Sequence, residues 1–253
     1  MPVLKGFTQI LGQDFSFTFA PVVWWDSICT LLSLAAINDY KLHQLDIKTA
    51  YLNGLLEEEI YMKAPKGFNY SSPFWQLWKG LYGLCQAGRQ WYLTLHAAYT
   101  DLGNSYCETD WSVYMWHNSS SLSMSATSID NILLVSDSKA ESDLATSEIN
   151  NKFIITDSGD ADWILGCRIT CCQAKCLLMI DQLQFILNIL HKFGIKHSKP
   201  NIMPCPKWRL SVNMCPKTNN ECQAVKSLPY CAIVRKCHLR TCSLYVKLQA
   251  VPF

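Results

Sequence analysis

Apolar residues recur at helical spacing in four stretches of the chain. The first has Asp26 or Ser27 as a residue suited to the N-cap position, and the last is followed by Gly194, a residue suited to end a helix. This pattern predicts helices at residues 27–40, 86–102, 139–153 and 182–193.

Other apolar stretches are short or alternate with polar residues, which is typical of strands. Phe15 to Phe19 alternates, and the polar run 117–121 separates two apolar segments as a hairpin turn does. With the helices, these segments follow a split βαβ order, so we predict an α+β fold with an antiparallel sheet and helices on one face. The predicted strands are 15–19, 42–47, 112–116, 122–135, 164–170 and 177–180.

Two acids lie at the ends of apolar segments. Asp46 stands between Leu45 and Ile47, shortly before the turn signal Asn53-Gly54, and Asp130 precedes a run of four apolar residues. A carboxylate in such a setting needs a partner or a cation. Because these two acids are far apart in sequence, they can meet only across a sheet, with Asp130 at a hairpin tip or bend.

Ordered blocks spread over about 200 residues resemble the reverse transcriptase of copia-type LTR retrotransposons. The block around Asp46 carries the resemblance first, and others follow it in the family's order. The matching blocks are Gly6-Phe7-Thr8-Gln9, Phe19-Ala20-Pro21-Val22-Val23, Gln44 to Gly54, Glu58 to Met62, Leu81-Tyr82-Gly83-Leu84, Gln86-Ala87, Arg89 to Tyr92, Phe193-Gly194, Lys199-Pro200 and Met203-Pro204.

The resemblance implies a polymerase palm with partial fingers and a truncated basic C-terminal extension. The expected parts are partial fingers and the first palm helix at 1–41, the palm with its motifs at 42–195, and a thumb or connection remnant at 196–253. The family continues into an RNase H domain, which we do not expect in a chain ending at Phe253. The implied activity is RNA-directed DNA synthesis, with an RNA template, a DNA primer, deoxynucleoside triphosphates and two Mg²⁺ ions as partners and cofactors.

The resemblance also assigns the site. Asp46 and Asp130 match metal-binding catalytic acids, whereas Asn131 stands where the family has a second consecutive Asp, which removes one negative charge from a site for two dications. Tyr51 matches the residue that rejects a ribose 2′-hydroxyl; the alternative is a core aromatic. Three further residues match contacts to template, nucleotide or phosphate, and for the first two a helix-cap or surface role is the alternative: Gln86, Arg89 and Lys5.

Several departures from the family predict weak or no activity. Besides Asn131, the chain has Trp24, Trp25 and Cys29 where bases are expected, and Thr127 or Ser128 where an aromatic residue is expected. The rival hypothesis is a non-catalytic remnant that at most binds nucleic acid. A third reading is a metal-binding or scaffold protein built on thirteen cysteines, four of which cluster without paired C-x-x-C spacing: Cys167, Cys171, Cys172 and Cys176.

Composition indicates a globular chain of 253 residues, 49% hydrophobic and 17% charged, without a membrane-length apolar run or an apolar leader. We therefore expect an intracellular protein, cytoplasmic or nuclear, that is not secreted and has no membrane partner. From Lys196 onward ten bases and one acid give +9, whereas twelve bases and nineteen acids before it give −7. This tail either contacts nucleic-acid phosphates or is simply solvated. The oligomeric state stays open.

Overall fold

The computed structural model describes residues 3–64, 67, 72–118, 121–172, 177–197, 215–226 and 245–249. The chain divides into two compact units. The first comprises residues 1–165, 169–178 and 248–253, and the second comprises 166–168 and 179–247. All predicted site residues lie in the first unit.

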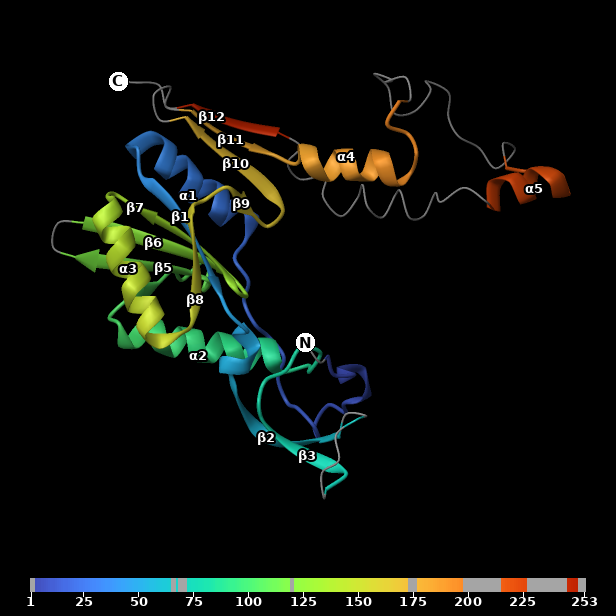
Figure 1. The fold of residues 1–253 in the computed structure, drawn as a ribbon, viewed down its shortest axis with the longest axis horizontal. Helices are drawn as coiled ribbons and strands as arrows, with labels where there is room; N and C mark the ends of the chain where they lie inside the picture. The colour runs from blue at the N-terminus through green and yellow to red at the C-terminus, as the bar shows by residue number, and fades with distance from the viewer. Residues whose placement is uncertain are drawn as a thin grey trace. The chain divides into compact units, whose positions relative to one another are not determined.

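A six-stranded sheet forms the centre of the first unit, in the order β4-β5-β6-β7-β1-β8 (Figure 1). Each neighbouring pair in it is antiparallel, which confirms the predicted α+β class with an antiparallel sheet. β1 is an inner strand, as its apolar sequence favours. The strands are β1 (Lys41–Ile47), β4 (Ser105–Tyr106), β5 (Val113–Asn118), β6 (Ser121–Ser128), β7 (Asn131–Ser136) and β8 (Ile155–Asp160).

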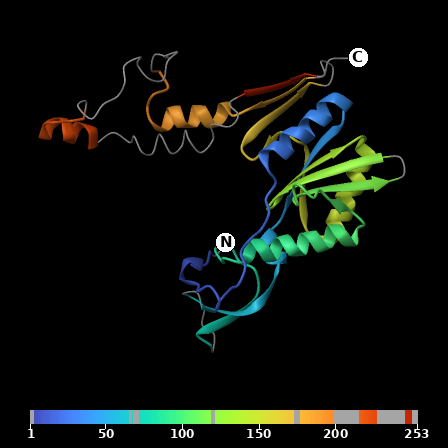
Figure 2. The same ribbon diagram turned by 180° about the vertical axis from the view of Figure 1, so that it is seen from behind.

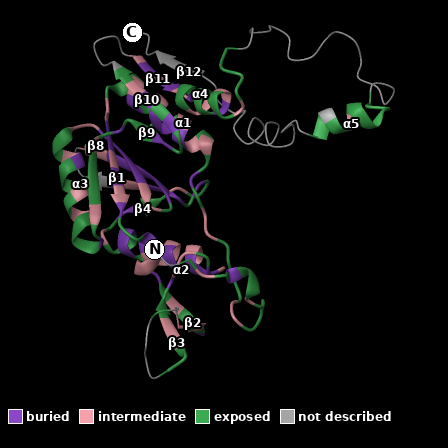
Figure 3. Ribbon diagram, turned by 45° about the vertical axis from the view of Figure 1, so that its right-hand side comes forward, coloured by how far each residue is buried: buried purple, intermediate pink, exposed green. Residues whose placement is uncertain are grey.

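Three helices of this unit are α1 (Trp25–Asn38), α2 (Ala87–Asp101) and α3 (Lys139–Lys152), close to the predicted ranges. Apolar residues of α2 and α3 form one buried cluster with β1 and β7. α1 contacts β6 and β7 from the opposite face of the sheet, so the predicted placement of the helices on one face is wrong (Figures 1 and 2). Figure 3 shows that buried residues are concentrated on the strands between these helices. α3 begins where the Ser138 hydroxyl accepts a hydrogen bond from the Glu141 amide at 3.3 Å. The buried cluster contains Leu45, Ile47, Ala50, Trp91, Leu95, Ala98, Tyr99, Tyr114, Trp116, Ile132, Leu134, Ala145, Ile149 and Phe153.

The start of α1 differs from the prediction. Trp24, not Asp26 or Ser27, is the N-cap residue, and its side chain makes no capping bond. Instead the Trp24 amide donates to Oδ2 of the buried Asp110 at 2.9 Å, so a carboxylate from a distant loop anchors the segment leading into the helix. A tertiary contact of this kind leaves no local sequence signal.

The predicted strand at 15–19 is wrong. This segment has no strand pairing beyond an isolated bridge between Leu11 and Phe15. Phe17 and Phe19 are 69% and 68% exposed, so the alternation does not correspond to one buried face. Alternation marks a strand only where a neighbouring strand and a core are available.

Two further differences concern strands. The predicted strand 122–135 is two strands, β6 and β7, joined by a two-residue turn at Ile129 and Asp130, so Asp130 lies at a hairpin tip as one of the two predicted alternatives. A separate antiparallel ribbon consists of β2 (Leu55–Lys63) and β3 (Phe74–Lys79), neither of which was predicted. The run Glu57-Glu58-Glu59 lies on β2, where alternate residues are exposed.

The remaining elements follow β8. β9 (Trp163–Ile164), β10 (Cys167–Cys172), β11 (Leu177–Asp181) and β12 (Tyr245–Gln249) form a four-stranded sheet in the order β12-β11-β10-β9. Two helices, α4 (Leu183–Lys192) and α5 (Asn219–Lys226), belong to the second unit, and two 3₁₀ turns, η1 (Gly6–Thr8) and η2 (Ala50–Asn53), to the first. No helix among the described residues is both long and apolar enough to cross a membrane. Much of the predicted basic tail lies outside the described residues.

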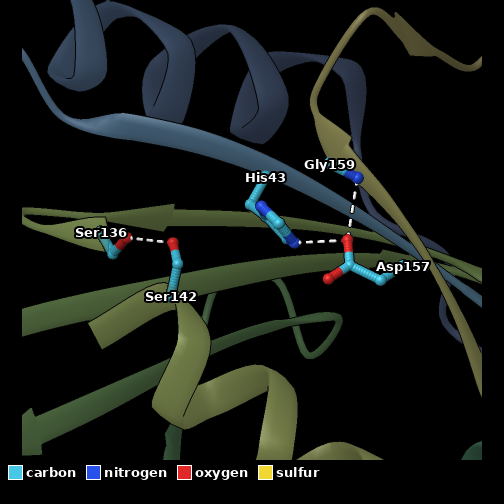
Figure 4. A network of polar contacts seen from close by, with 5 residues as sticks. All are labelled: His43, Ser136, Ser142, Asp157 and Gly159. Carbon is cyan, nitrogen blue, oxygen red and sulfur yellow. Dashed lines mark hydrogen bonds and ion pairs between the residues drawn. The ribbon is translucent and has the colours of Figure 1, made fainter. Parts of the chain in front are cut away.

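Polar contacts hold β8 to β1 and α3 to β7 (Figure 4). His43 Nε2 lies 2.7 Å from Asp157 Oδ1, and the Gly159 amide donates to the same oxygen at 2.8 Å. This contact sits where the register between β1 and β8 shifts, next to Gln44. The hydroxyls of Ser136 and Ser142 are 2.5 Å apart. The first contact joins β8 to β1, the strand that carries Asp46, and the second joins α3 to β7, the other neighbour of β1.

Candidate active site

Asp46 and Asp130 come together where β1 ends and the β6–β7 turn begins. Asp46 is paired with Asn131 in the β1–β7 register, and the Ile47 amide donates to the Asp130 carbonyl at 2.7 Å. Because β1 and β7 are adjacent and antiparallel, the end of one strand meets the start of the other. The sheet therefore brings the two predicted acids to the same end of two adjacent inner strands.

The negative charge of Asp130 acts on the Asp46 carboxylate. Partial burial and the negative charge of Asp130 both raise the pKa of Asp46 above its ordinary value. Both side chains remain partly exposed. Two partly desolvated anions that repel one another form a site at which a cation lowers the energy of both.

Asn131 lies directly beside this pair. Its Nδ2 donates to Asp130 Oδ1 at 3.2 Å, and its Oδ1 accepts a hydrogen bond of 3.4 Å from Gln44 Nε2. The amide nitrogen therefore occupies one face of the Asp130 carboxylate, where a carboxylate at position 131 would offer a further anionic oxygen. An amide oxygen can still bind Mg²⁺, but it contributes no charge.

The turn that holds Asp130 is strained. Ile129 has a φ of 57°, a left-handed conformation that is unfavourable for a β-branched residue. The indole Nε1 of Trp91 on α2 donates to the Ile129 carbonyl at 2.7 Å. The buried Trp91 side chain thus fixes the backbone of the turn through this hydrogen bond.

Tyr51 and Tyr82 form an aromatic pair beside the acids. Their ring centroids are 4.5 Å apart with an interplanar angle of 53°. Burial and the charge of Asp130 raise the pKa of both phenols, and Asp46 adds to the effect on Tyr82. Both phenols are therefore neutral at physiological pH and can donate hydrogen bonds next to the carboxylates.

Gly54 explains how Tyr51 reaches this position. A Cβ on Gly54 would lie 2.8 Å from the Trp91 amide nitrogen and 2.9 Å from the Gln90 carbonyl carbon, closer than real Cβ contacts. Only glycine allows η2 to lie directly against α2 here. The Gly54 carbonyl also accepts a hydrogen bond of 2.9 Å from the Gly80 amide.

A small, mainly apolar pocket of about 90 Å³ opens next to Tyr51. The turn residue Ile129 and the helix residue Trp91 also line it, together with Gly88. An apolar hollow beside a carboxylate pair offers room for an uncharged part of a ligand.

The other predicted contact residues are not gathered around the acids in the same way. Gln86 is fully buried, and its Nε2 donates to the Asp14 carbonyl at 3.0 Å while its Oε1 accepts from Gln9 at 3.0 Å. Arg89 lies 5.3 Å from the centroid of the Phe17 ring and contacts the Phe19 carbonyl at 3.5 Å. Lys5 is exposed at the start of η1.

Sequence reasoning did not assign a site role to Tyr82 or Trp91. Both lie within family-like blocks, so the blocks marked the region, but nothing in the sequence links Tyr82 to Tyr51 or Trp91 to Ile129. These contacts depend on the β3–α2 connection and on the packing of α2. Both contacts join segments that are distant in sequence, so only the tertiary structure shows them.

The donor set fits a hard divalent cation only in part. Asp46, Asp130 and the Asn131 carbonyl are oxygen donors of the kind that Mg²⁺ prefers. Across the described part of the chain, no group of three or more His, Cys, Asp or Glu side chains is placed to hold a metal. Of the four clustered cysteines considered above, Cys176 lies outside the described residues.

The raised pKa of Asp46 predicts a pH-dependent change in stability for Asp46→Asn. The folded chain holds this proton more tightly than the unfolded chain, so ionised Asp46 opposes folding at neutral pH and the penalty disappears at acid pH. Without added metal, Asp46→Asn is expected to unfold at a higher temperature than the unmodified chain at pH 7, with a smaller difference at pH 4. Thermal unfolding by circular dichroism at both pH values measures this. The exposed Asp143→Asn is the control, and an equal effect of both variants would contradict the argument.

Comparisons with known proteins identify the family of the chain. The family model described as reverse transcriptase (RNA-dependent DNA polymerase) matches residues 2–207. The chain is 36% identical over 237 residues to the retrovirus-related Pol polyprotein from transposon TNT 1-94 of Nicotiana tabacum, covering 92% of this chain and 18% of that polyprotein. It is 29% identical over 243 residues to that of transposon RE1 of Arabidopsis thaliana, covering 92% and 16%.

The chain thus spans less than a fifth of the length of these curated relatives. No solved structure matches it significantly. The family model nevertheless covers most of the chain, and the relatives are Pol polyproteins of plant copia-type transposons. The resemblance seen in the sequence blocks is confirmed: the chain belongs to the reverse transcriptase family, as a copia-type reverse transcriptase domain.

Proposed function

We propose that the chain catalyses RNA-directed DNA synthesis at Asp46, Asp130 and Asn131, with low activity. The observation that carries this proposal is the meeting of Asp46 and Asp130 at adjacent strand ends, close enough for the charge of Asp130 to raise the pKa of Asp46. The family of the chain supplies the reaction class.

Asp46 and Asp130 would hold two Mg²⁺ ions. When bound, such ions activate the primer 3′-hydroxyl and stabilise the leaving pyrophosphate. The protein's own part is to fix the two acids: β1 positions Asp46, and Trp91 and the β6–β7 turn position Asp130. Tyr51 would lie along the sugar of the incoming nucleotide and exclude a 2′-hydroxyl.

Low activity follows from the chemistry at position 131. With Asn131 the site has two carboxylates rather than three for two dications and a triphosphate, so cation repulsion is offset less well. Hydrogen bonding of the Asn131 amide to Asp130 also engages an oxygen that would otherwise be available to a cation.

The three segments of the chain have different proposed roles. We assign partial fingers and the first palm helix to 1–41, the palm to 42–195 and a basic remnant to 196–253. Arg89 and Lys5 are cationic and would contact phosphates of the template, primer or nucleotide. Gln86 would act indirectly, because its amide group is occupied by Gln9 and Asp14.

Primer extension tests the proposal. Purified chain with a DNA primer on an RNA template and Mg²⁺ is expected to extend the primer slowly, and Asp46→Asn is expected to lower the rate at least about a hundredfold. The matched control is Asp143→Asn, an exposed acid on α3, which is expected to leave the rate unchanged. Equal rates for the unmodified chain and Asp46→Asn would contradict the proposal.

A second candidate function is nucleic-acid binding without catalysis, which the neutral Asn131 favours. Either function predicts salt-sensitive binding that involves the basic tail. Replacing the exposed Lys217 and Lys226 with Gln is expected to make the slope of log affinity against log salt shallower by up to about two units, since each lost phosphate contact removes about 0.7–0.9. Titration of a labelled RNA–DNA hybrid from 50 to 200 mM salt measures the slope. An unchanged slope would exclude these lysines from the interface.

A further inference from the structure

We propose that Tyr82 is a positioning residue that sets sugar discrimination by holding the ring of Tyr51. The inference rests on the proposed function, because it assigns Tyr51 to the sugar of an incoming nucleotide. It adds a residue from a different segment of the chain, the connection between β3 and α2.

Tyr51 and Tyr82 are in direct ring contact. The rings of Tyr51 and Tyr82 pack at a centroid distance of 4.5 Å with a tilt of 53°, within the range of favourable aromatic pairs. Both side chains are only partly buried, and Tyr51 also packs against two buried clusters, so the pair lies between the core and the solvent-accessible site. A ring exposed on one side needs a support on the other to keep one orientation.

The backbone around Tyr82 is held in place by contacts with the N-terminal segment. The Leu4 amide donates to the Tyr82 carbonyl at 2.8 Å. A Cβ on the next residue, Gly83, would lie 2.1 Å from the Leu4 carbonyl oxygen, so the two segments are in direct backbone contact. The backbone that carries Tyr82 is therefore locked against the N-terminal segment.

The pair lies close to the two acids. Tyr51 follows β1, which carries Asp46, and lines the same pocket as Ile129, the residue before Asp130. Tyr82 is in ring contact with Tyr51. A nucleotide whose phosphates are held near those acids would have its sugar close to this pair. Loss of the Tyr82 ring would let Tyr51 turn away and open space for a 2′-hydroxyl. The Tyr82 hydroxyl is not needed for this role.

The experiment measures nucleotide selection by binding, without turnover. The unmodified chain is bound to an RNA template and a primer ending in a dideoxynucleotide, and dUTP or UTP, which differ only in the 2′-hydroxyl, stabilises the complex opposite a template adenine. The ratio of the two dissociation constants gives the discrimination. We expect Tyr82→Ala to lower it about tenfold, or about 1.4 kcal/mol, and Tyr82→Phe to preserve it.

The control is Tyr106→Ala, a partly exposed tyrosine on β4 outside the site, which is expected to keep the ratio. Thermal unfolding of each variant separates a general loss of stability, which would weaken both nucleotides equally, from a change in their ratio. A clear dUTP preference that Tyr82→Ala leaves intact overturns the role of Tyr82 alone. If neither nucleotide stabilises the unmodified complex, the proposed function fails and the inference fails with it.

Discussion

Asn131→Asp is expected to raise Mg²⁺-dependent primer extension on an RNA template by about tenfold or more. The substitution restores a third carboxylate beside Asp46 and Asp130 and removes the amide that donates to Asp130. In a partly desolvated site, a negative charge stabilises bound dications far better than a neutral amide. Single-turnover extension at several Mg²⁺ concentrations measures the gain, which should be accompanied by a lower Mg²⁺ requirement.

Two variants make this result interpretable. Asn131→Ala removes the same hydrogen bond without adding charge, so it should not reproduce the gain. Asn131→Asp combined with Asp46→Asn should fall back to background, because the new carboxylate then lacks its partner. If Asn131→Asp stays at background while still binding the hybrid, the loss of activity extends beyond position 131 and the non-catalytic function is favoured.

The second large effect concerns stability. Trp91→Ala is expected to lower the free energy of unfolding by about 3–5 kcal/mol. The Trp91 side chain is 3% exposed, packs edge-on against Phe153 at 5.1 Å, and donates to the Ile129 carbonyl. Truncation leaves a cavity in the main core and an unsatisfied carbonyl in the strained turn.

Urea unfolding followed by circular dichroism measures this loss. Trp91→Phe keeps an aromatic ring but loses the indole hydrogen bond and part of the buried volume, so a smaller loss of about 1–3 kcal/mol is expected. Trp78→Ala on β3 is the control, since its side chain is 70% exposed and its removal should change stability by less than about 0.5 kcal/mol. Similar losses for Trp78→Ala and Trp91→Ala would mean that Trp91 is not a core residue.

The helices and the acids were predictable because their signals are local. Helical spacing located α1, α2, α3 and α4 to within a few residues, and an acid at the end of an apolar run drew attention to Asp46 and Asp130. The requirement that these acids meet across a sheet agrees with the observed β1–β7 pairing. Their roles remain a prediction.

The contacts around the acids were not predictable, since they join segments without shared local pattern. The Asp110 anchor of α1, the Trp91 bond to the turn and the Tyr51–Tyr82 pair all depend on how helices and loops pack. Gln86 is a further example: the structure places its side chain in a buried polar network with Gln9 and Asp14, which the block match did not predict, and its role at a substrate stays a prediction. Periodicity does not report such packing.

The inner position of β1 has a consequence for the order in which the chain folds. Its neighbours in the sheet are β7 and β8, and Gln44 on β1 is 87 positions away from its hydrogen-bond partner Asn131. At roughly 5–20 residues per second of synthesis, β1 leaves the ribosome several seconds before either neighbour exists. Non-local pairings of this kind form slowly, so β1 is synthesised with two open edges that favour association with other chains. We therefore expect the acid pair to assemble late, after β7 has been synthesised, and β1 to be exposed to other chains until then.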